Sequence, residues 1–113
     1  MKAKYTVALL FAALLFLASC GSPLPEDRKG YAGEWSSHTV NLRIGTDGMV
    51  NYVHQEGGTK TTINAYIQKF DGNNFEVGAL GINTTFVVSK AAHQEDGVWK
   101  MTVDGRELTR YEE

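Results

Sequence analysis

The three histidines are the side chains of this sequence best suited to acid–base or metal chemistry. His38, His54 and His93 lack the HxH or HxxxH spacing that would hold a metal ion, so we predict no metal site. His38 and His54 lie in phase with apolar neighbours. Their rings could face one another beside Glu34 or Glu56, although histidines at the rims of strands are the simpler interpretation.

The serines and aspartates also lack the pattern of a reaction centre. Ser36, Ser37 and Ser89 carry no motif of an activated nucleophile. Four aspartates are each followed by glycine, which is typical of hairpin turns and not of paired catalytic acids. These are Asp47, Asp71, Asp96 and Asp104. We therefore predict no catalytic residues and a protein that is not an enzyme.

The single cysteine, Cys20, follows a short basic start and an apolar segment. Lys2 and Lys4 precede an uncharged run over residues 5–17. A helix of that length spans about 20 Å, less than the ~30 Å core of a bilayer. The run therefore predicts a cleaved secretory signal. A single cysteine also excludes a disulfide framework within the chain.

Leu17-Ala18-Ser19-Cys20 resembles the lipobox of bacterial lipoprotein precursors. The resemblance implies that the Cys20 sulfur receives diacylglycerol, that a peptidase cleaves before Cys20, and that the new amino terminus is acylated. Two or three such chains hold a protein on a membrane almost permanently. We expect no cofactor other than this covalent lipid.

The residues after Cys20 predict a tether and a location. Both prolines, Pro23 and Pro25, lie in residues 21–30, which favours an extended linker. Gly21 and Ser22 lack the aspartate that often retains Gram-negative lipoproteins in the inner membrane, so the resemblance favours the periplasmic leaflet of the outer membrane. The predicted divisions are a signal peptide (1–19), a lipidated tether (20–30) and a β-barrel domain (31–113).

Residues 31–113 show period-two hydrophobicity interrupted by glycine turns. Val40, Leu42 and Ile44 alternate with polar residues, and similar runs recur every 8–14 residues. Phe70 breaks the phase of its strand, which predicts a bulge near residues 68–69. We predict an all-β antiparallel meander of about seven to eight strands, either a closed barrel or a sandwich.

Gly33-Glu34-Trp35 resembles the Gly-x-Trp opening of lipocalins and other calycins. The resemblance implies a barrel with Trp35 across its closed end and room for an apolar ligand. An open cavity would then be lined by Tyr52, Ile63, Phe86 and Trp99. The alternative is that Trp35 is a core aromatic and that the interior is filled by its own side chains.

Arg106 and Arg110 flank Leu108 on one face of the last expected strand. They either form a partner-binding patch or pair with Glu112 and Glu113.

The charge of the chain argues against a nucleic-acid partner, because the residues from Cys20 onward are mildly acidic, with nine basic and 13 acidic side chains. We expect a monomeric, membrane-anchored module that binds another envelope component. The alternatives are a carrier of a small apolar ligand and an enzyme inhibitor. Small barrel lipoproteins that inhibit lysozymes resemble this chain in size and anchoring, but they carry a cysteine pair that it lacks.

Overall fold

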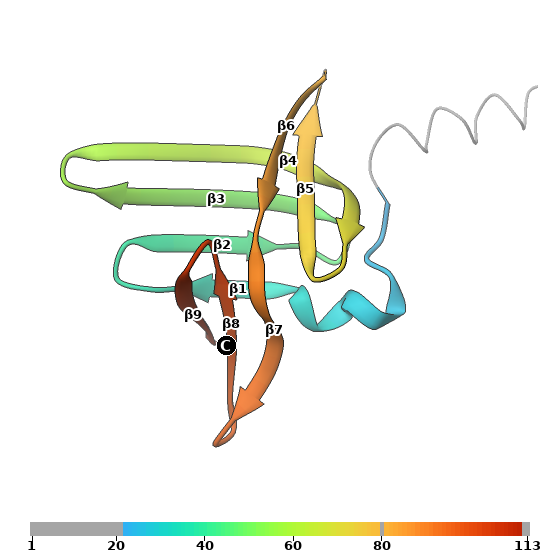
Figure 1. The fold of residues 1–113 in the computed structure, drawn as a ribbon, viewed down its shortest axis with the longest axis vertical. Coiled ribbons are helices and arrows are strands. Elements are labelled where there is room, and N and C mark those ends of the chain that lie inside the picture. The colour runs from blue at the N-terminus through green and yellow to red at the C-terminus, as the bar shows by residue number, and fades with distance from the viewer. Residues whose placement is uncertain (1–21, 80, 112–113) are drawn as a thin grey trace, which may run out of the picture.

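The computed structural model describes residues 22–79 and 81–111, and Cys20 lies outside them. These residues form one 3₁₀ helix and nine antiparallel strands (Figure 1). The elements are η1 (Glu26–Tyr31), β1 (Gly33–Ser36), β2 (Val40–Ile44), β3 (Met49–Glu56), β4 (Thr59–Asp71), β5 (Asn74–Ala79), β6 (Ile82–Phe86), β7 (Val88–Glu95), β8 (Val98–Val103) and β9 (Arg106–Tyr111). The all-β prediction is confirmed.

The nine strands form one sheet in the order β6-β5-β4-β3-β2-β1-β9-β8-β7. Each neighbour is also a neighbour in sequence except for β1 and β9, so the first and last strands lie side by side. In Figure 1, β1 to β4 lie side by side, and β5 to β8 run across them. The sheet therefore curls into a half-barrel.

Neither the closed barrel nor the sandwich of seven to eight strands forms, because the nine strands make one open sheet and one segment supplies both of its edges. β6 pairs only with β5 and β7 pairs only with β8 among the described strands, and Val87 alone separates β6 from β7. A closed barrel needs each strand to pair on both sides over the same stretch. The chain instead changes partners at Val87.

Two side chains fix the change of partner at Val87. The Val87 N–H donates to Asp104 Oδ1 at 2.9 Å, and the Asp104 N–H donates to the Val87 carbonyl at 2.7 Å. On the other side, the Val88 N–H donates to Asn74 Oδ1 at 2.8 Å. These bonds satisfy backbone groups that the interrupted strand would otherwise leave without a partner.

Asp104→Ala is expected to destabilise the protein by about 1–3 kcal/mol. The substitution removes the acceptor of the Val87 N–H and places alanine at a φ of 50°, where a Cβ is strained. Asp104→Asn keeps an acceptor and tolerates this backbone, so its loss should be less than half as large. Urea unfolding of both variants measures the difference. Equal losses would contradict this explanation.

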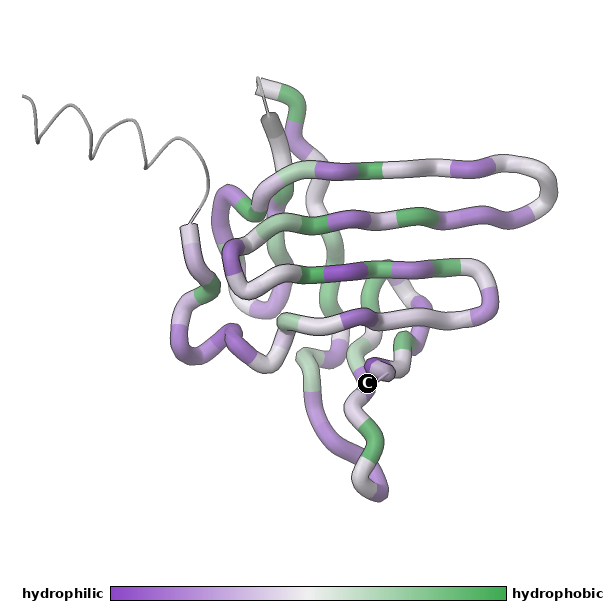
Figure 2. The backbone as a smooth tube through the Cα atoms, turned by 180° about the vertical axis from the view of Figure 1, so that it is seen from behind, coloured by the Kyte–Doolittle hydropathy of each residue, from purple (hydrophilic) through white to green (hydrophobic). Residues whose placement is uncertain are grey.

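Alternation along each strand builds the core. Val40, Leu42 and Ile44 are buried while Asn41 and Arg43 are exposed, as the sequence predicts. Figure 2 shows the same alternation of hydrophobic and hydrophilic residues along the neighbouring strands. The most deeply buried large side chains are Trp35, Phe75, Phe86, Leu42, Ile44, Met101 and Leu108.

Two irregular features shape the strands. The Ser37 N–H turns back to the Val40 carbonyl at 2.9 Å, so residues 35–44 form a hairpin that sets β1 against β2. Residues 91–93 lie in the bulged strand β7. The bulge expected near residues 68–69 is present, as a register shift between Ile67 and Lys69.

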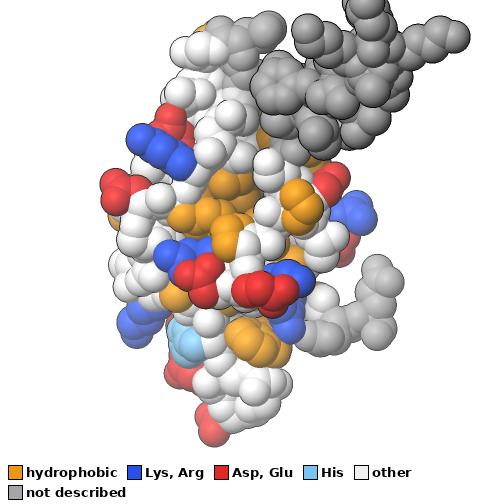
Figure 3. Space-filling model, turned by 90° about the vertical axis from the view of Figure 1, so that its right-hand side faces the viewer, with side chains coloured by type: hydrophobic (Ala, Val, Ile, Leu, Met, Phe, Trp, Pro, Cys, Tyr) orange, Lys and Arg blue, Asp and Glu red, His pale blue; other side chains and the backbone are white. Residues whose placement is uncertain are grey.

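Folded structure begins inside the segment expected to be a tether. Leu24 is buried in the core, and its N–H donates to the Thr46 carbonyl at 3.0 Å. The Tyr31 hydroxyl at the end of η1 donates to the Asn73 carbonyl at 2.8 Å. Within η1, Lys29 Nζ lies 3.0 Å from Glu26 Oε1. Figure 3 shows oppositely charged side chains lying beside one another on one face of the molecule.

Candidate functional site

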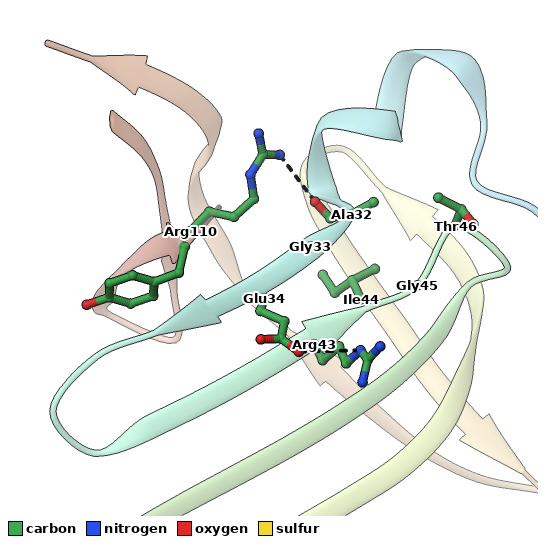
Figure 4. Close-up of a pocket in the computed structure, with 9 residues that line it drawn as sticks. Ala32, Gly33, Glu34, Arg43, Ile44, Gly45, Thr46 and Arg110 are labelled. Carbon is green, nitrogen blue, oxygen red and sulfur yellow. Dashed lines mark hydrogen bonds and ion pairs between the residues drawn. The ribbon is translucent and has the colours of Figure 1, made fainter. Parts of the chain in front are cut away.

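The outer face of β1 carries two adjoining hollows that share Glu34, Arg43 and Tyr111. We call them together the β1 groove. The first hollow has a volume of about 580 Å³ and adds Ala32, Gly33, Ile44, Gly45, Thr46 and Arg110 to the shared residues (Figure 4). The second has a volume of about 440 Å³ and adds Trp35, Ser36, Asn41, Leu42, Asn51 and Val53.

Strand register assembles the polar lining of the groove. Glu34 lies opposite Tyr111 on one side and opposite Arg43 on the other. Arg43 in turn lies opposite Asn51, which lies opposite Asn64. Because residues opposite one another point to the same face, these five side chains form one row across β9, β1, β2, β3 and β4. Four of them line the groove, and Asn64 extends the row beyond it. We call this set the polar row.

The charges within the polar row neutralise one another. Arg43 Nε lies 3.7 Å from Glu34 Oε1, and both side chains are more than half exposed. Such an exposed ion pair contributes at most about 1 kcal/mol to stability. Farther along, Asn51 Nδ2 donates to Asn64 Oδ1 at 2.7 Å. The row is thus uncharged overall and rich in hydrogen-bonding atoms.

Arg110 borders the first hollow, but its side chain lies on the opposite face of β1 from Glu34, because Arg110 is opposite Trp35 in the register. Its guanidinium lies 4.5 Å from the ring centre of Trp99 and 5.6 Å from that of Trp35. The same group donates to the Ala32 carbonyl at 3.2 Å, as Figure 4 shows. Its side chain passes over Gly33, where a Cβ atom would lie 2.5 Å from Arg110 Cδ. Gly33 and Trp35 of the Gly-x-Trp sequence thus both contact Arg110.

The other residues singled out in the sequence lie in two different places. Trp35 is 1% exposed, and its indole N–H donates to the Tyr31 carbonyl at 2.9 Å. Tyr52 is buried against Phe86, whereas Trp99 is half-buried beneath Arg110. Arg106 contacts Glu56 at 3.4 Å, and Leu108 between the two arginines is buried. Arg106 and Arg110 therefore engage different parts of the domain and do not form one exposed patch. Glu112 and Glu113 lie outside the described residues.

The histidines do not meet one another. His38 is exposed in the β1–β2 turn, whereas His54 Nε2 lies 3.1 Å from Glu56 Oε1. The hydrogen bond from His54 is the main cause that lowers the pKa of Glu56, and Arg106 contributes as well. Residues 22–79 and 81–111 contain no group of three acidic, histidine or cysteine side chains able to hold a metal ion.

His93 lies between two acceptors on the edge strand β7. Its Nδ1 is 2.7 Å from the Ala91 carbonyl, and its Nε2 is 2.7 Å from Glu95 Oε2. Both contacts favour the imidazolium, so the Ala91 carbonyl first and Glu95 second raise the pKa of His93. The hydrogen bond from His93 correspondingly lowers the pKa of Glu95.

Glu95→Gln is expected to move the pKa of His93 back toward its ordinary value, as followed by NMR titration of the ring protons. The raised folded pKa of His93 gives stability that is lost as pH rises through that pKa. The lowered folded pKa of Glu95 gives stability that is lost as pH falls through that second pKa. The pair therefore stabilises the fold most between the two values. An unchanged His93 titration in the variant would contradict the contact.

Aromatic rings fill the interior where a carrier would hold a ligand. Phe86 lies between Tyr52 and Phe75, with a ring-centre distance of 5.0 Å to each. Tyr31 adds an edge contact to Phe75 at 6.1 Å. Phe75 and Phe86 are both at most 1% exposed. Of the residues expected to line an open cavity, Tyr52 and Phe86 thus pack against one another, whereas Trp99 lies beneath Arg110.

Comparisons of the chain with family models, curated proteins and solved structures give no match. The geometry of the β1 groove and the packing of the interior are therefore the basis for any inference about function.

Sequence reasoning missed most of the polar row. The alternation along β2 predicts that Arg43 points outward, but no local pattern brings Glu34, Asn51, Asn64 and Tyr111 together with it. The missing information is the register, which places Glu34 opposite both Arg43 and Tyr111.

The β1 groove lies near the point where the described chain begins. Thr46, which lines the first hollow, accepts the hydrogen bond from Leu24 and also borders a smaller hollow beside Pro23. An extended chain covers at most about 14 Å between residues 20 and 24. An attachment at residue 20 would therefore keep this end of the domain within about 14 Å of it. Among the described residues, no helix is long and apolar enough to cross a membrane.

Proposed function

We propose that this protein is a lipid-anchored binding module of the bacterial envelope that holds its partner in the β1 groove and catalyses no reaction. The β1 groove supports the binding role because it is hollowed and exposed and carries the polar row, whereas Tyr52, Phe75 and Phe86 occupy the interior. This contrast favours an outer-surface binder over a carrier of an apolar ligand. It is the observation that carries the proposal.

Attachment occurs through lipid on Cys20, as the Leu17-Ala18-Ser19-Cys20 sequence suggests. The outer membrane's periplasmic leaflet is the proposed location, because Gly21 and Ser22 lack the retention aspartate. The short connection between Cys20 and the buried Leu24 replaces the long tether expected from the prolines. The β1 groove then opens close to the membrane surface, and its partner is a component of that layer.

The anchor is tested by labelling cells with an alkyne analogue of palmitate. The wild-type chain should incorporate the label and sediment with membranes, because its only cysteine carries the lipid. A Cys20→Ser chain should do neither. Sedimentation and labelling of the Cys20→Ser chain would overturn the anchor.

The groove is tested by photo-crosslinking in intact envelopes. A crosslinking residue at Asn41, inside the second hollow, should capture a discrete product. The same residue at Lys90, on the exposed edge of β7, is the matched control and should not. Arg43→Ala should remove the product at Asn41 without changing thermal stability. Products that are equal at both positions would overturn the assignment of the site.

A further inference from the structure

The polar row points to one class of ligand. We infer that the β1 groove binds an uncharged, hydroxyl-rich glycan laid across β9, β1, β2, β3 and β4. This inference rests on the proposed binding function and adds the chemistry of the partner. It is argued from the backbone pairing, the hydrogen-bonding groups, the charge and the aromatic ring of this face.

Backbone pairing decides what this face can offer. β9, β1, β2, β3 and β4 all lie inside the sheet, so each is hydrogen-bonded to a strand on both sides. A peptide that binds by strand addition needs a free edge, and this face has none. Recognition here must therefore go through side chains.

The side chains of the polar row are planar groups with paired hydrogen-bonding atoms. Glu34 offers two acceptors, Arg43 offers a fork of donors, and the amides of Asn51 and Asn64 offer both. The hydroxyls of a sugar both donate and accept, and neighbouring hydroxyls present these atoms in pairs. Ser36 and Asn41 add a hydroxyl and an amide beside the row. A hydroxyl-rich ligand can satisfy this mixture, whereas an apolar ligand would strip water from it without compensation.

The charge of the row excludes strongly ionic ligands. Arg43 lies 3.7 Å from Glu34, so the two cancel. Arg110 lies at the wall of the groove, but its guanidinium stacks on Trp99 and donates to the Ala32 carbonyl. A polyanion would require an excess of cations that these residues do not supply. The fitting ligand is uncharged.

Tyr111 supplies the apolar component that a sugar ring needs. Its side chain is 67% exposed at the end of the row, where it borders both hollows. An exposed tyrosine ring presents a flat apolar face and a polar hydroxyl. The C–H face of a pyranose can lie on that ring while its hydroxyls reach Glu34. With strands about 4.8 Å apart, the row is about 19 Å long, enough for several sugar units.

The test is titration of the full-length anchored protein in detergent with two uncharged oligosaccharides, the tetramer of N-acetylglucosamine and cellotetraose. Calorimetry and the side-chain amide signals of Asn51 and Asn64 report binding. We expect saturable binding of at least one oligosaccharide. Tyr111→Ala and Asn51→Ala should each weaken it about tenfold, which corresponds to about 1.4 kcal/mol. Tyr111→Phe, which keeps the ring, should weaken it less.

Two exposed residues away from the groove provide matched controls. Val98→Ala removes an exposed apolar side chain on β8, and Asn73→Ala removes an exposed amide in the β4–β5 turn. Neither should change the affinity. Binding that is unaffected by the groove variants would overturn the inference.

Failure of the glycan inference is distinguishable from failure of the proposed function. If no oligosaccharide binds at millimolar concentration while crosslinking at Asn41 still captures a product that Arg43→Ala removes, the groove binds another class of partner. The glycan inference is then wrong and the binding function stands. If no oligosaccharide binds and no crosslinked product forms, both the glycan inference and the proposed binding function are wrong.

Discussion

Gly33→Ala is expected to lower the free energy of unfolding by about 2–4 kcal/mol. Gly33 has a φ of +132°, which side-chain-bearing residues adopt only at a cost of about 1–3 kcal/mol. The new Cβ would also lie 2.5 Å from Arg110 Cδ and displace the guanidinium that stacks on Trp99. Loss of that stacking adds roughly 0.5–2 kcal/mol. Chemical denaturation of the purified protein measures the total.

Gly30→Ala is the matched control for Gly33→Ala. A Cβ at Gly30 would lie 3.8 Å from Ala92 and from Trp99, which is ordinary contact, so stability should change little. Combining Gly33→Ala with Arg110→Ala should cost less than the sum of the single losses, because the displaced side chain is gone. Additive losses would show that the contact between Gly33 and Arg110 does not matter.

Phe75→Ala is expected to cost about 3–5 kcal/mol, the largest single loss we predict. Phe75 is 0% exposed and packs against Phe86, Tyr31 and Phe70. It therefore joins η1 to the centre of the half-barrel. Thermal and urea unfolding measure the loss. Phe70→Ala, at a half-buried ring of the same cluster, should cost about half as much.

Comparison of the wild-type protein with Phe75→Ala also tests whether the interior is filled. The wild-type protein should not take up a small apolar probe such as benzene, because rings occupy the space between β3 and β5. Phe75→Ala opens an apolar cavity that can admit one. If the wild-type protein bound the probe as tightly as Phe75→Ala does, the result would instead favour a carrier of an apolar ligand.

Local patterns predicted much of the secondary structure. Alternation predicted β2, since Val40, Leu42 and Ile44 are buried as expected. The Asp-Gly pairs marked turns, and Asp96 and Asp104 both have positive φ. The break in alternation at Phe70 predicted the bulge in β4. These features depend on a few neighbouring residues, so a single sequence contains them.

Features that depend on distant contacts were not predictable in the same way. The change of partner at Val87 depends on Asn74 and Asp104, which are far from it along the chain. Nothing in the residues around Val87 indicates that β6 and β7 will pair with different strands. Leu24 likewise looks like part of a linker until Thr46 accepts its N–H and the core covers its side chain.

The amino-acid sequence alone determined the strand-forming periods, the glycine turns and the motif around Cys20, because hydrophobic spacing and turn propensity act over a few residues. The tertiary structure decided that the sheet stays open, that its interior is packed, and that Tyr111, Glu34 and Arg43 lie in one row. The physical reason is register: shifting one strand by a single residue turns every side chain to the other face. Which residues meet across strands is settled only when the whole sheet packs around its core.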